Sequence, residues 1–293
     1  MDEQYWSNLP PEFETRVYRK RNLDLAFMPG SMLSAHYERR GRERGRVANR
    51  LRNRNDFVRL IPQDASALEI GPFWHPLLIN RPNVYNFDLL PQETLRERAR
   101  ALGVDPDGVP PIHYVSETGD LSVIDRKFDV VFSSHVLEHQ YDLIAHLQGV
   151  GRLLNPGGAY FLMVPDKRYC FDHFIPESSL AEIVIAHREQ RAGASLRNMI
   201  EVRVLTTHND CVRHWAGDHG DIFGAFGPRL DAAEKDFVAF NGAYFDTHCW
   251  YFSSTNARTI FDTLHVAGLS PLGVFRLYPT RYNAGEFWMI LRP

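Results

Sequence analysis

The sequence is poor in cysteine and has no long apolar run, and these two absences exclude several classes of protein. Its 293 residues include three cysteines, Cys170, Cys211 and Cys249, and no CxxC pair. Such a set cannot form the disulfide framework of a small secreted domain, so we expect a reducing compartment. No window of about 18 residues is free of charge, which argues against a membrane-spanning helix. The opening residues, MDEQYWSNLPPEF, are acidic and polar, unlike a secretory signal, so we expect a cytoplasmic protein.

An excess of charge of one sign is also lacking. The formal net charge is −3, because 33 Lys and Arg oppose 36 Asp and Glu, so nucleic acid is not an expected partner. Residues 39–59 depart from this balance, with nine Arg against Glu43 and Asp56, a local charge of 9 − 2 = +7. A sparse apolar stripe there allows a helix. The segment is either a solvated arm or a docking surface for an anionic partner, such as phosphate or an acidic membrane. We assign residues 1–63 to an N-terminal, partly helical, Arg-rich arm.

From residue 66 onward, short apolar runs alternate with helical patterns. Runs of strand length occupy 66–70, 84–88, 112–115, 128–134, 159–164, 272–278 and 286–292. Near-continuous apolar runs indicate strands buried on both faces, as in a parallel sheet. Helical patterns occupy 91–102, 141–154 and 254–267, each followed by glycine. The alternation predicts an α/β fold with a doubly wound, mostly parallel seven-stranded sheet of the Rossmann-like kind.

The stretch 166–250 interrupts this alternation. It carries helical patterns at about 178–191 and 230–240, with a polar, His-rich stretch between them. We expect a helical insertion after the fifth strand, which packs over the carboxyl edge of the sheet as a lid and acceptor-binding region within a domain of residues 64–293. His208, His214 and His219 are not at a standard zinc spacing, so a polar lid or substrate loop is the favoured interpretation.

Ligands of an open α/β sheet bind beyond the carboxyl ends of its strands. Asp88 ends the second strand, where an acidic side chain suits the two hydroxyls of a ribose, and it lies 88 − 69 = 19 residues after Glu69. The Gly-rich turn that a diphosphate needs is missing, since Phe73 and Trp74 follow Gly71 and Pro72. The edge therefore suits a nucleoside without phosphates better than a dinucleotide.

Several segments, taken in order, resemble the motifs of one enzyme family. They are ALEIGPFWHPLL (67–78), YNFDLLP (85–91), ETGDL (117–121), FDVVFSSHVLEH (128–139) and LLNPGGAYFLMVPDKRY (153–169). Together they resemble the class I S-adenosylmethionine (SAM)-dependent methyltransferases over residues 64–293. PDKRYCFDHF (165–174) and DTHCWYFSS (246–254) resemble a subgroup often associated with bacterial cell-surface polysaccharide biosynthesis.

The resemblance implies a cofactor and a set of residues that contact it. The cofactor would be SAM and the product S-adenosylhomocysteine (SAH). Glu69 and Gly71 would flank the methionine part, and Asp88 would hold the ribose hydroxyls. Asp120 and Leu121 would meet the adenine. Ser134 and His135 would line the sulfonium side.

The transfer step needs alignment more than activation. An SN2 methyl transfer requires a nucleophile held in line with the methyl group and shielded from water. A hydroxyl acceptor also needs a base, and histidine titrates near neutral pH. His139 and His135 follow the fourth strand and are the predicted catalytic residues, with Asp172, His173 and His248 as competing candidates for the base.

Residues suited to an acceptor follow the fifth strand and recur in the insertion. Lys167 and Arg168 can bind a phosphate or carboxylate; a surface ion pair is the alternative, but their position at the ligand edge of the sheet favours binding. Tyr169 and Trp250 can stack on a ring, whereas aromatic residues also serve as core. We group as substrate-binding residues Lys167, Arg168, Tyr169, His173, His248 and Trp250.

The spacing His135-x-x-Glu138-His139 matches a zinc-protease pattern, H-x-x-E-H. We exclude a protease, because the motif begins at a strand end in a nucleoside-binding sheet rather than inside a helix. It also resembles a Glu/His cluster that binds a divalent ion in some 2′-O-methyltransferases of small RNAs and some ubiquinone-pathway O-methyltransferases. We expect no metal, with His135, Glu138 and His139 as the ligands in the alternative case.

Three hypotheses follow for the function. The main one is a SAM-dependent methyltransferase that O-methylates a glycan or another small polar acceptor, anionic acceptors included, with a histidine as general base. In the second, the acceptor is RNA, methylated at a 2′ hydroxyl with the help of a metal and bound by residues 39–59. In the third, the chain is a non-catalytic partner subunit with a methyltransferase fold, which only the glycine-poor turn after the first strand supports.

Overall fold

One mixed sheet organises the protein. The computed structural model describes residues 1–240 and 245–293, and within them seven strands form a single sheet in the order β3-β2-β1-β4-β5-β7-β6. The strands are β1 (Ala67–Ile70), β2 (Val84–Asp88), β3 (Tyr114–Val115), β4 (Phe128–Ser134), β5 (Leu154–Pro165), β6 (Gly273–Tyr278) and β7 (Glu286–Arg292). The first five are parallel, and β7 runs antiparallel to both β5 and β6. The predicted doubly wound, mostly parallel sheet is confirmed.

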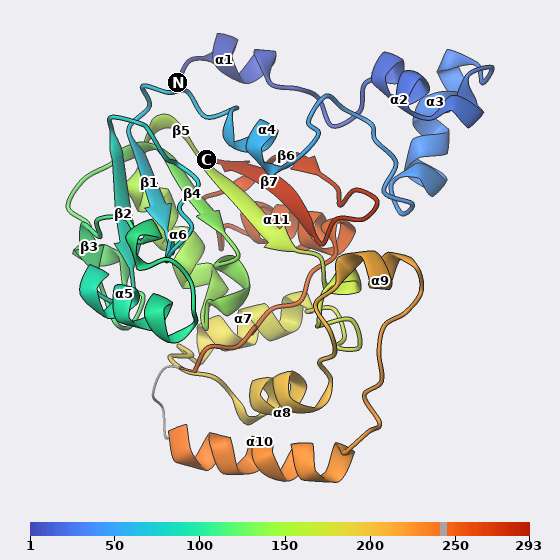
Figure 1. Ribbon diagram of the computed structural model, residues 1–293. Helices are drawn as coiled ribbons and strands as arrows, with labels where there is room; N and C mark the ends of the chain where they lie inside the picture. Colours follow the sequence, from blue (N-terminus) through green and yellow to red (C-terminus); the bar gives the residue numbers. More distant parts are fainter. Residues whose placement is uncertain (241–244) are drawn as a thin grey trace.

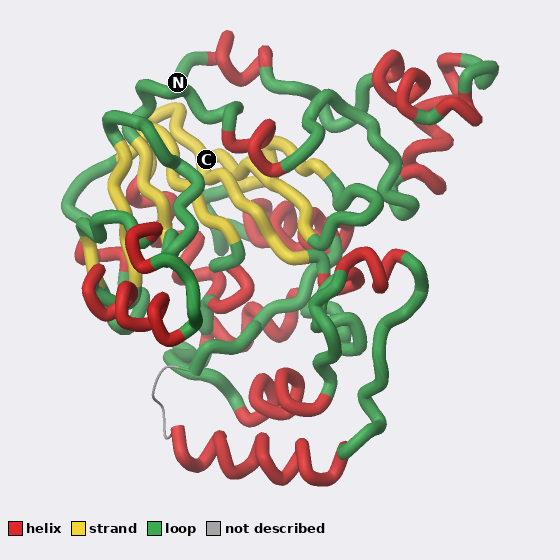
Figure 2. Tube along the Cα trace, viewed as in Figure 1, coloured by secondary structure: helices red, strands yellow, loops and turns green. Residues whose placement is uncertain are grey.

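Helices surround this sheet, which forms the central yellow layer of Figure 2. The α-helices are α1 (Glu3–Asn8), α2 (Thr15–Arg21), α3 (Gly30–His36), α4 (Arg54–Val58), α5 (Gln92–Ala101), α6 (Leu143–Leu153), α7 (Leu180–Arg188), α8 (Leu196–Val204), α9 (Cys211–Trp215), α10 (Phe226–Phe240) and α11 (Ser254–Val266). Short helical turns are η1 (Leu23–Leu25), η2 (Tyr37–Gly41), η3 (Pro106–Gly108), η4 (Leu121–Val123), η5 (Leu137–His139) and η6 (Lys167–Tyr169). Within the described residues, each helix is too short or too polar to cross a lipid bilayer.

Strand β5 shows why the sheet needs a layer on each face. Its side chains alternate, as in any strand: Tyr160 and Leu162 face one core cluster, and Phe161 and Met163 face another. The first cluster is completed by the apolar faces of α6 and α11, whose N-caps are Asp142 and Ser253. All four strand residues are fully buried. Both faces of the strand therefore depend on a covering layer.

The N-terminal residues supply the layer on the second face. Trp6, Leu51, Phe57 and Ile61 are buried in one cluster with strand residues such as Ile290. The ring of Phe57 stacks on Trp288 of β7, with 5.6 Å between the ring centroids and 20° between the planes. The division at residue 63 stays a prediction, but residues on both sides of it share one core.

The stretch 39–59, where the sequence allows a helix, is helical only at its two ends. In the structure η2 ends at Gly41 and α4 begins at Arg54, with irregular chain between them. One cause is Gly45, whose φ is +61° and where an added Cβ would lie 2.3 Å from the backbone nitrogen of Tyr282. Among the described residues, six of the nine arginines form ion pairs within the chain: Arg42, Arg46, Arg50, Arg52, Arg54 and Arg59.

The predicted insertion lies beyond the arrowheads of β4 and β5, where Figure 1 shows α7, α8, α9 and α10. Helix α7 joins the main core through Ile183 and Ala186, whereas α8 and α10 pack on each other around Met199 and Ala233. Residues 241–244 of this insertion lie outside the described residues. Helices α8 and α9 were not predicted, although Ser195 caps α8 with a capping box that the sequence could have revealed.

The packing of Phe57 leads to a stability prediction. Phe57→Ala should lower the free energy of unfolding by about 3–5 kcal/mol, because it opens a cavity between the N-terminal layer and the sheet. Urea denaturation followed by circular dichroism measures this. The matched control, Phe27→Ala, removes a fully exposed ring from the same N-terminal region and should change stability by less than about 0.5 kcal/mol. Equal stability of the two variants would contradict the packing.

Candidate functional site

The turn after β1 is held by a buried carboxylate. Glu69 accepts hydrogen bonds from the backbone N–H groups of Leu77 (2.8 Å) and Leu78 (2.9 Å). Burial raises the pKa of Glu69 to about 7, although these two donors oppose the shift. Gly71 has a φ of +68°, and an added Cβ there would lie 2.7 Å from Cγ2 of Val136. Glu69 and Gly71 thus fix residues 71–78 closely against the end of β4.

Two further carboxylates lie at the ends of neighbouring strands. Asp88 accepts from the N–H of Leu89 at 2.7 Å, and burial raises its pKa against the effect of nearby backbone amides, including that of Phe73. Asp120 caps η4 by accepting from the backbone N–H and the hydroxyl of Ser122, which lower its pKa. Leu121, the next residue, is buried in the main core. The amide of Phe73 brings the turn after β1 to Asp88.

The end of β4 carries an ion pair between an exposed histidine and a half-buried carboxylate. His135 has a φ of +55°, a costly conformation for a residue with a Cβ, and its Nε2 lies 2.8 Å from Oε2 of Glu286. The same carboxylate accepts from Arg54 at 2.6 Å and from the indole N–H of Trp288 at 2.9 Å. Burial alone would raise the pKa of Glu286, but His135 and Arg54 outweigh it and lower the pKa to about 2. Arg54 is also 3.5 Å from the hydroxyl of Ser134.

Glu138 lies beside these groups with unusual surroundings. Its side chain is fully buried, and neither carboxylate oxygen has a hydrogen-bond partner within the described residues. The nearest cationic candidates are Nδ1 of His135 at 3.7 Å and Nε2 of His248 at 3.9 Å. Because a buried carboxylate without donors is costly, this position favours a positive charge next to it. Glu138, His139 and His248 offer ligand atoms that all lie within 4.8 Å of one another.

Two histidines of this cluster differ in their electrostatics. Nδ1 of His248 lies 2.6 Å from the buried carboxylate of Asp172. Burial disfavours the charged ring, but Asp172 and Glu138 outweigh burial and raise the pKa of His248. His139 contacts the ring of His248 edge-on, with 4.7 Å between centroids, and its Nδ1 is 3.1 Å from the carbonyl of Thr247. Burial lowers the pKa of His139 against the opposing effect of Glu138, and so favours its neutral ring.

A cavity of about 770 Å³ opens beside these residues. His135, His248 and Glu286 line it, together with Tyr169 and Arg281. Arg281 bonds to the side chain and carbonyl oxygens of Asn49 and, within the described residues, forms no ion pair. Burial lowers its pKa to about 10, so it remains charged at neutral pH. The cavity therefore presents a cation whose hydrogen-bond partner is uncharged.

Several of the predicted substrate residues have partners within the chain. Lys167 donates to the carbonyl of His173 at 2.7 Å, and Arg168 makes two bonds to Asp166, at 2.9 and 2.7 Å. Their binding of an acceptor anion stays a prediction, with both charges already engaged. Trp250 is 2% exposed and belongs to the main core, which corrects the expectation that it stacks on a ligand.

The cavity also contains Arg54, Arg281 and Glu286, none of which was singled out from the sequence, although Arg54 belongs to the Arg-rich stretch 39–59. Glu286 is the first residue of β7 and pairs with Pro165, the last residue of β5. An antiparallel last strand thus places its beginning at the carboxyl edge of the parallel strands. The direction of this strand, rather than any local motif, could have revealed that Glu286 lies at the cavity.

Comparison with known proteins assigns the chain to a family. The model of a family described as a methyltransferase domain matches residues 39–265. Among curated proteins, none matches. Among solved structures, the chain is similar to the CcbJ methyltransferase of Streptomyces caelestis, with 20% identity over 39% of this chain and 52% of that chain and a TM-score of 0.31. It thus spans about half the length of that protein.

Two other solved structures are covered over more of their length. A SAM-dependent methyltransferase from Mesorhizobium loti shares 15% identity over 80% of this chain and 95% of that one, with a TM-score of 0.39. The DhpI–SAH complex shares 15% identity over 95% of this chain and 94% of that one, with a TM-score of 0.38.

Removing the Glu286 carboxylate should weaken the fold and change its response to acid. Because the folded-state pKa is about 2, below the ordinary 4.5, Glu286 contributes stability above pH 4.5 that is lost as the pH falls towards 2. Glu286→Gln should therefore lower the free energy of unfolding by about 3 kcal/mol at pH 7, with a shallower further loss in acid. Chemical denaturation at pH 7, 4 and 3 tests this.

The control is Glu93→Gln, which removes one partner of an exposed ion pair on α5 and should cost less than about 0.5 kcal/mol. If Glu286→Gln matched this control at every pH, the ion pair of Glu286 would not stabilise the fold.

Proposed function

This chain belongs to the class I SAM-dependent methyltransferases, and on that premise we propose that it O-methylates a small polar acceptor that carries a negative charge. A member of this family uses SAM as its methyl donor and forms SAH. The observation that carries the acceptor proposal is the cavity beside His135 and His248, where Arg281 has no carboxylate partner within the described residues. An acceptor carboxylate or phosphate would supply that partner.

The residues at the edge of β1, β2 and β4 fit the cofactor. The carboxylate of Asp88 suits two ribose hydroxyls, and the close approach at Gly71 leaves no space for a Cβ. We assign the adenine side to Asp120 and Leu121, and the sulfonium side to Ser134 and His135. Glu69 acts by holding the turn after β1, because both of its oxygens accept backbone N–H groups. When bound, SAM supplies a methyl group already activated by its sulfonium.

A histidine next to the cavity serves as the general base. His248 lines the cavity, and its Nδ1–H donates to Asp172, which leaves the lone pair on Nε2. His139 and His135 remain the bases proposed from the sequence. His139 lies against His248, and His135 lines the cavity but is paired with Glu286. The bond to Asp172 makes His248 the base that we favour.

The two segments that resemble the polysaccharide subgroup support a glycan as the acceptor. Asp166 forms an isolated bridge with Phe252, and the backbone N–H of Lys167 donates to the carbonyl of Phe252 at 2.9 Å. Asp172 and His248 come from the same two segments. We propose that the segments act together at the cavity, on a sugar that bears a carboxylate or phosphate.

A metal-assisted variant has one specific observation in its favour. Glu138 is fully buried without a hydrogen-bond donor within the described residues, and His139 and His248 lie near it. A divalent ion held there would polarise an acceptor hydroxyl. His135 belongs to this set less clearly, since Glu286 occupies its Nε2. RNA as the acceptor has less support, because most arginines of 39–59 already form ion pairs.

Calorimetry with SAM tests the enzyme proposal and the position of the cofactor. Asp88→Ala should weaken SAM binding by about 10- to 100-fold, because the ribose hydroxyls lose a charged partner. Glu97→Ala, which removes an exposed carboxylate from the helix after the same strand, should leave the affinity unchanged. No SAM binding by the wild type would favour the non-catalytic subunit, and unaltered affinity in Asp88→Ala would place the cofactor elsewhere.

Transfer of labelled methyl groups from SAM tests the base. His248→Gln should lower kcat by about 100-fold or more without weakening SAM binding. In the wild type, kcat/KM should rise with pH through a pKa above 6.5, since the base acts when deprotonated. Asp172→Asn should move this rise in kcat/KM to lower pH, because burial then becomes the main influence on the pKa of His248.

The control is His187→Gln, whose ring also bonds a carboxylate, that of Asp142, but on α7. The same assay compares neutral sugars with sugars that carry a carboxylate or a phosphate as methyl acceptors. The acidic sugars should react faster. A His248→Gln variant as active as the control would refute this base.

A further inference from the structure

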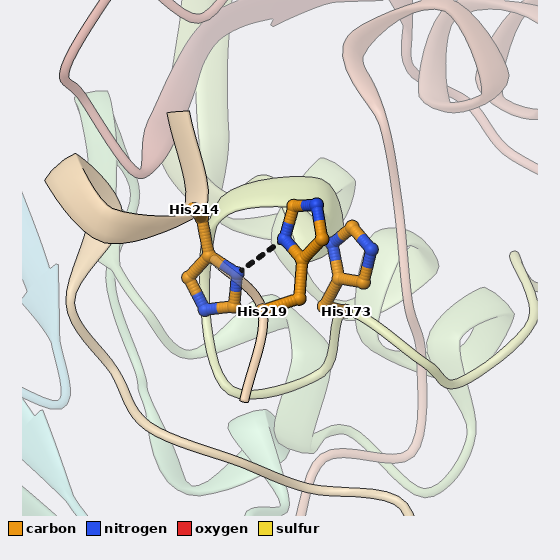
Figure 3. A group of neighbouring side chains, drawn as sticks. All are labelled: His173, His214 and His219. Atoms are coloured by element: carbon orange, nitrogen blue, oxygen red, sulfur yellow. Dashed lines mark hydrogen bonds between the residues drawn. The ribbon is translucent and has the colours of Figure 1, made fainter. Parts of the chain in front are cut away.

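Three histidines outside the proposed active site converge from distant positions. His173 follows η6, His214 belongs to α9, and His219 lies in the turn after it. Their ligand atoms all lie within 4.8 Å of one another, and Figure 3 shows the three rings gathered at one point. Nδ1 of His214 is 3.0 Å from Nδ1 of His219, and the rings of His173 and His219 stack with 3.5 Å between centroids.

The hydrogen bonds around the cluster fix where two of the ring protons lie. Nδ1 of His173 lies 2.8 Å from the carbonyl of Arg168, and Nε2 of His214 lies 3.0 Å from the carbonyl of His208. A carbonyl can only accept, so these nitrogens carry the protons. Nε2 of His173 and Nδ1 of His214 therefore carry lone pairs, and Nδ1 of His214 accepts a hydrogen bond from Nδ1 of His219, whose proton a bound ion would displace. Metal-binding histidines typically donate their second N–H to a backbone carbonyl in this way.

No ion pair holds the three histidine rings together within the described residues. Within the described residues, none of the three rings forms an ion pair with a carboxylate. Burial lowers the pKa values of His173 and His214, against the raising effect of the carbonyls of Arg168 and His208 and with the help of the neighbouring histidines, and so favours the neutral rings. Neutral imidazoles are the form that binds a metal ion.

We propose that His173, His214 and His219 bind a zinc ion. An all-imidazole set suits borderline ions such as Zn²⁺ rather than Mg²⁺ or Ca²⁺. Two nitrogens at about 2.0–2.1 Å from a tetrahedral zinc lie about 3.3 Å apart, close to the 3.0 Å between His214 and His219. The stacked ring of His219 would rotate to face the ion; it is partly exposed and precedes Gly220, whose φ is +76°. The fourth position stays open.

The ion would join two walls of the cavity. One wall comes from the chain before His173, including Tyr169, and the other from the segment that includes Cys211. The ring of Tyr169 already stacks on Trp215, with 3.7 Å between centroids and 8° between the planes. A zinc ion beside this stack would fasten α9 to the loop after β5. The expected consequence is a more stable, better ordered cavity.

Metal titration of the full chain, freed of metal by chelation, tests the proposal. Zn²⁺ should bind one-to-one in calorimetry and raise the thermal midpoint, and Co²⁺ should give the visible absorption of a tetrahedral site. His173→Gln and His219→Gln, both partly exposed, should lose the absorption and the rise in Tm. His187→Gln, a histidine outside the cluster, should keep both.

Glu138→Gln separates this site from the cluster around Glu138, and circular dichroism checks that each variant is folded. The proposal is overturned if the wild type shows no tetrahedral Co²⁺ absorption. It is also overturned if folded His219→Gln keeps that absorption, or if Glu138→Gln removes it. None of these readouts depends on methyl transfer, so this test and that of the proposed function fail independently.

Discussion

The carboxylate of Glu286 connects the parts of the protein that form the cavity. It binds His135 at the end of β4, Arg54 of the N-terminal layer and the indole of Trp288. His135 and Arg54 keep Glu286 ionised although it is half-buried, since its pKa is about 2. The shape of the cavity and the charge of His135 both depend on this contact. It exists because β7 is antiparallel and so presents its first residue at the carboxyl edge.

The parallel strands were predictable because each leaves a local signal. The runs at β1, β2, β4 and β5 are apolar over strand length, and the residues that follow each run, such as Asp88 and His135, could be placed at one edge from topology alone. The N-terminal layer was not predictable, because Trp6 and Phe57 lie in helices of six and five residues, too short to show a helical period in the sequence. Arg281 and Glu286 escaped detection for a related reason. Each joins the cavity through contacts with residues hundreds of positions away.

The two histidine clusters contrast in their charge. His248 lies between the carboxylates of Asp172 and Glu138, which favour its charged form and suit a group that takes up a proton. His173 and His214 lie in a cluster without carboxylate partners in the described residues, and backbone carbonyls hold their protons. The spacing of His214 and His219 alone could not predict the second cluster, because its third member, His173, lies 41 positions (214 − 173) before His214.

The core shared by the N-terminal layer and β7 has a consequence for the synthesis of the chain. Arg54 contacts Glu286, and Phe57 contacts Trp288, each more than 200 positions later in the chain. During translation the apolar side chains of the N-terminal layer therefore lack their partners until the ribosome has added the more than 200 residues that lead to β7. Contacts of such long range slow folding and prolong the exposure of apolar surface. We expect the nascent chain to need protection from aggregation until β7 leaves the ribosome.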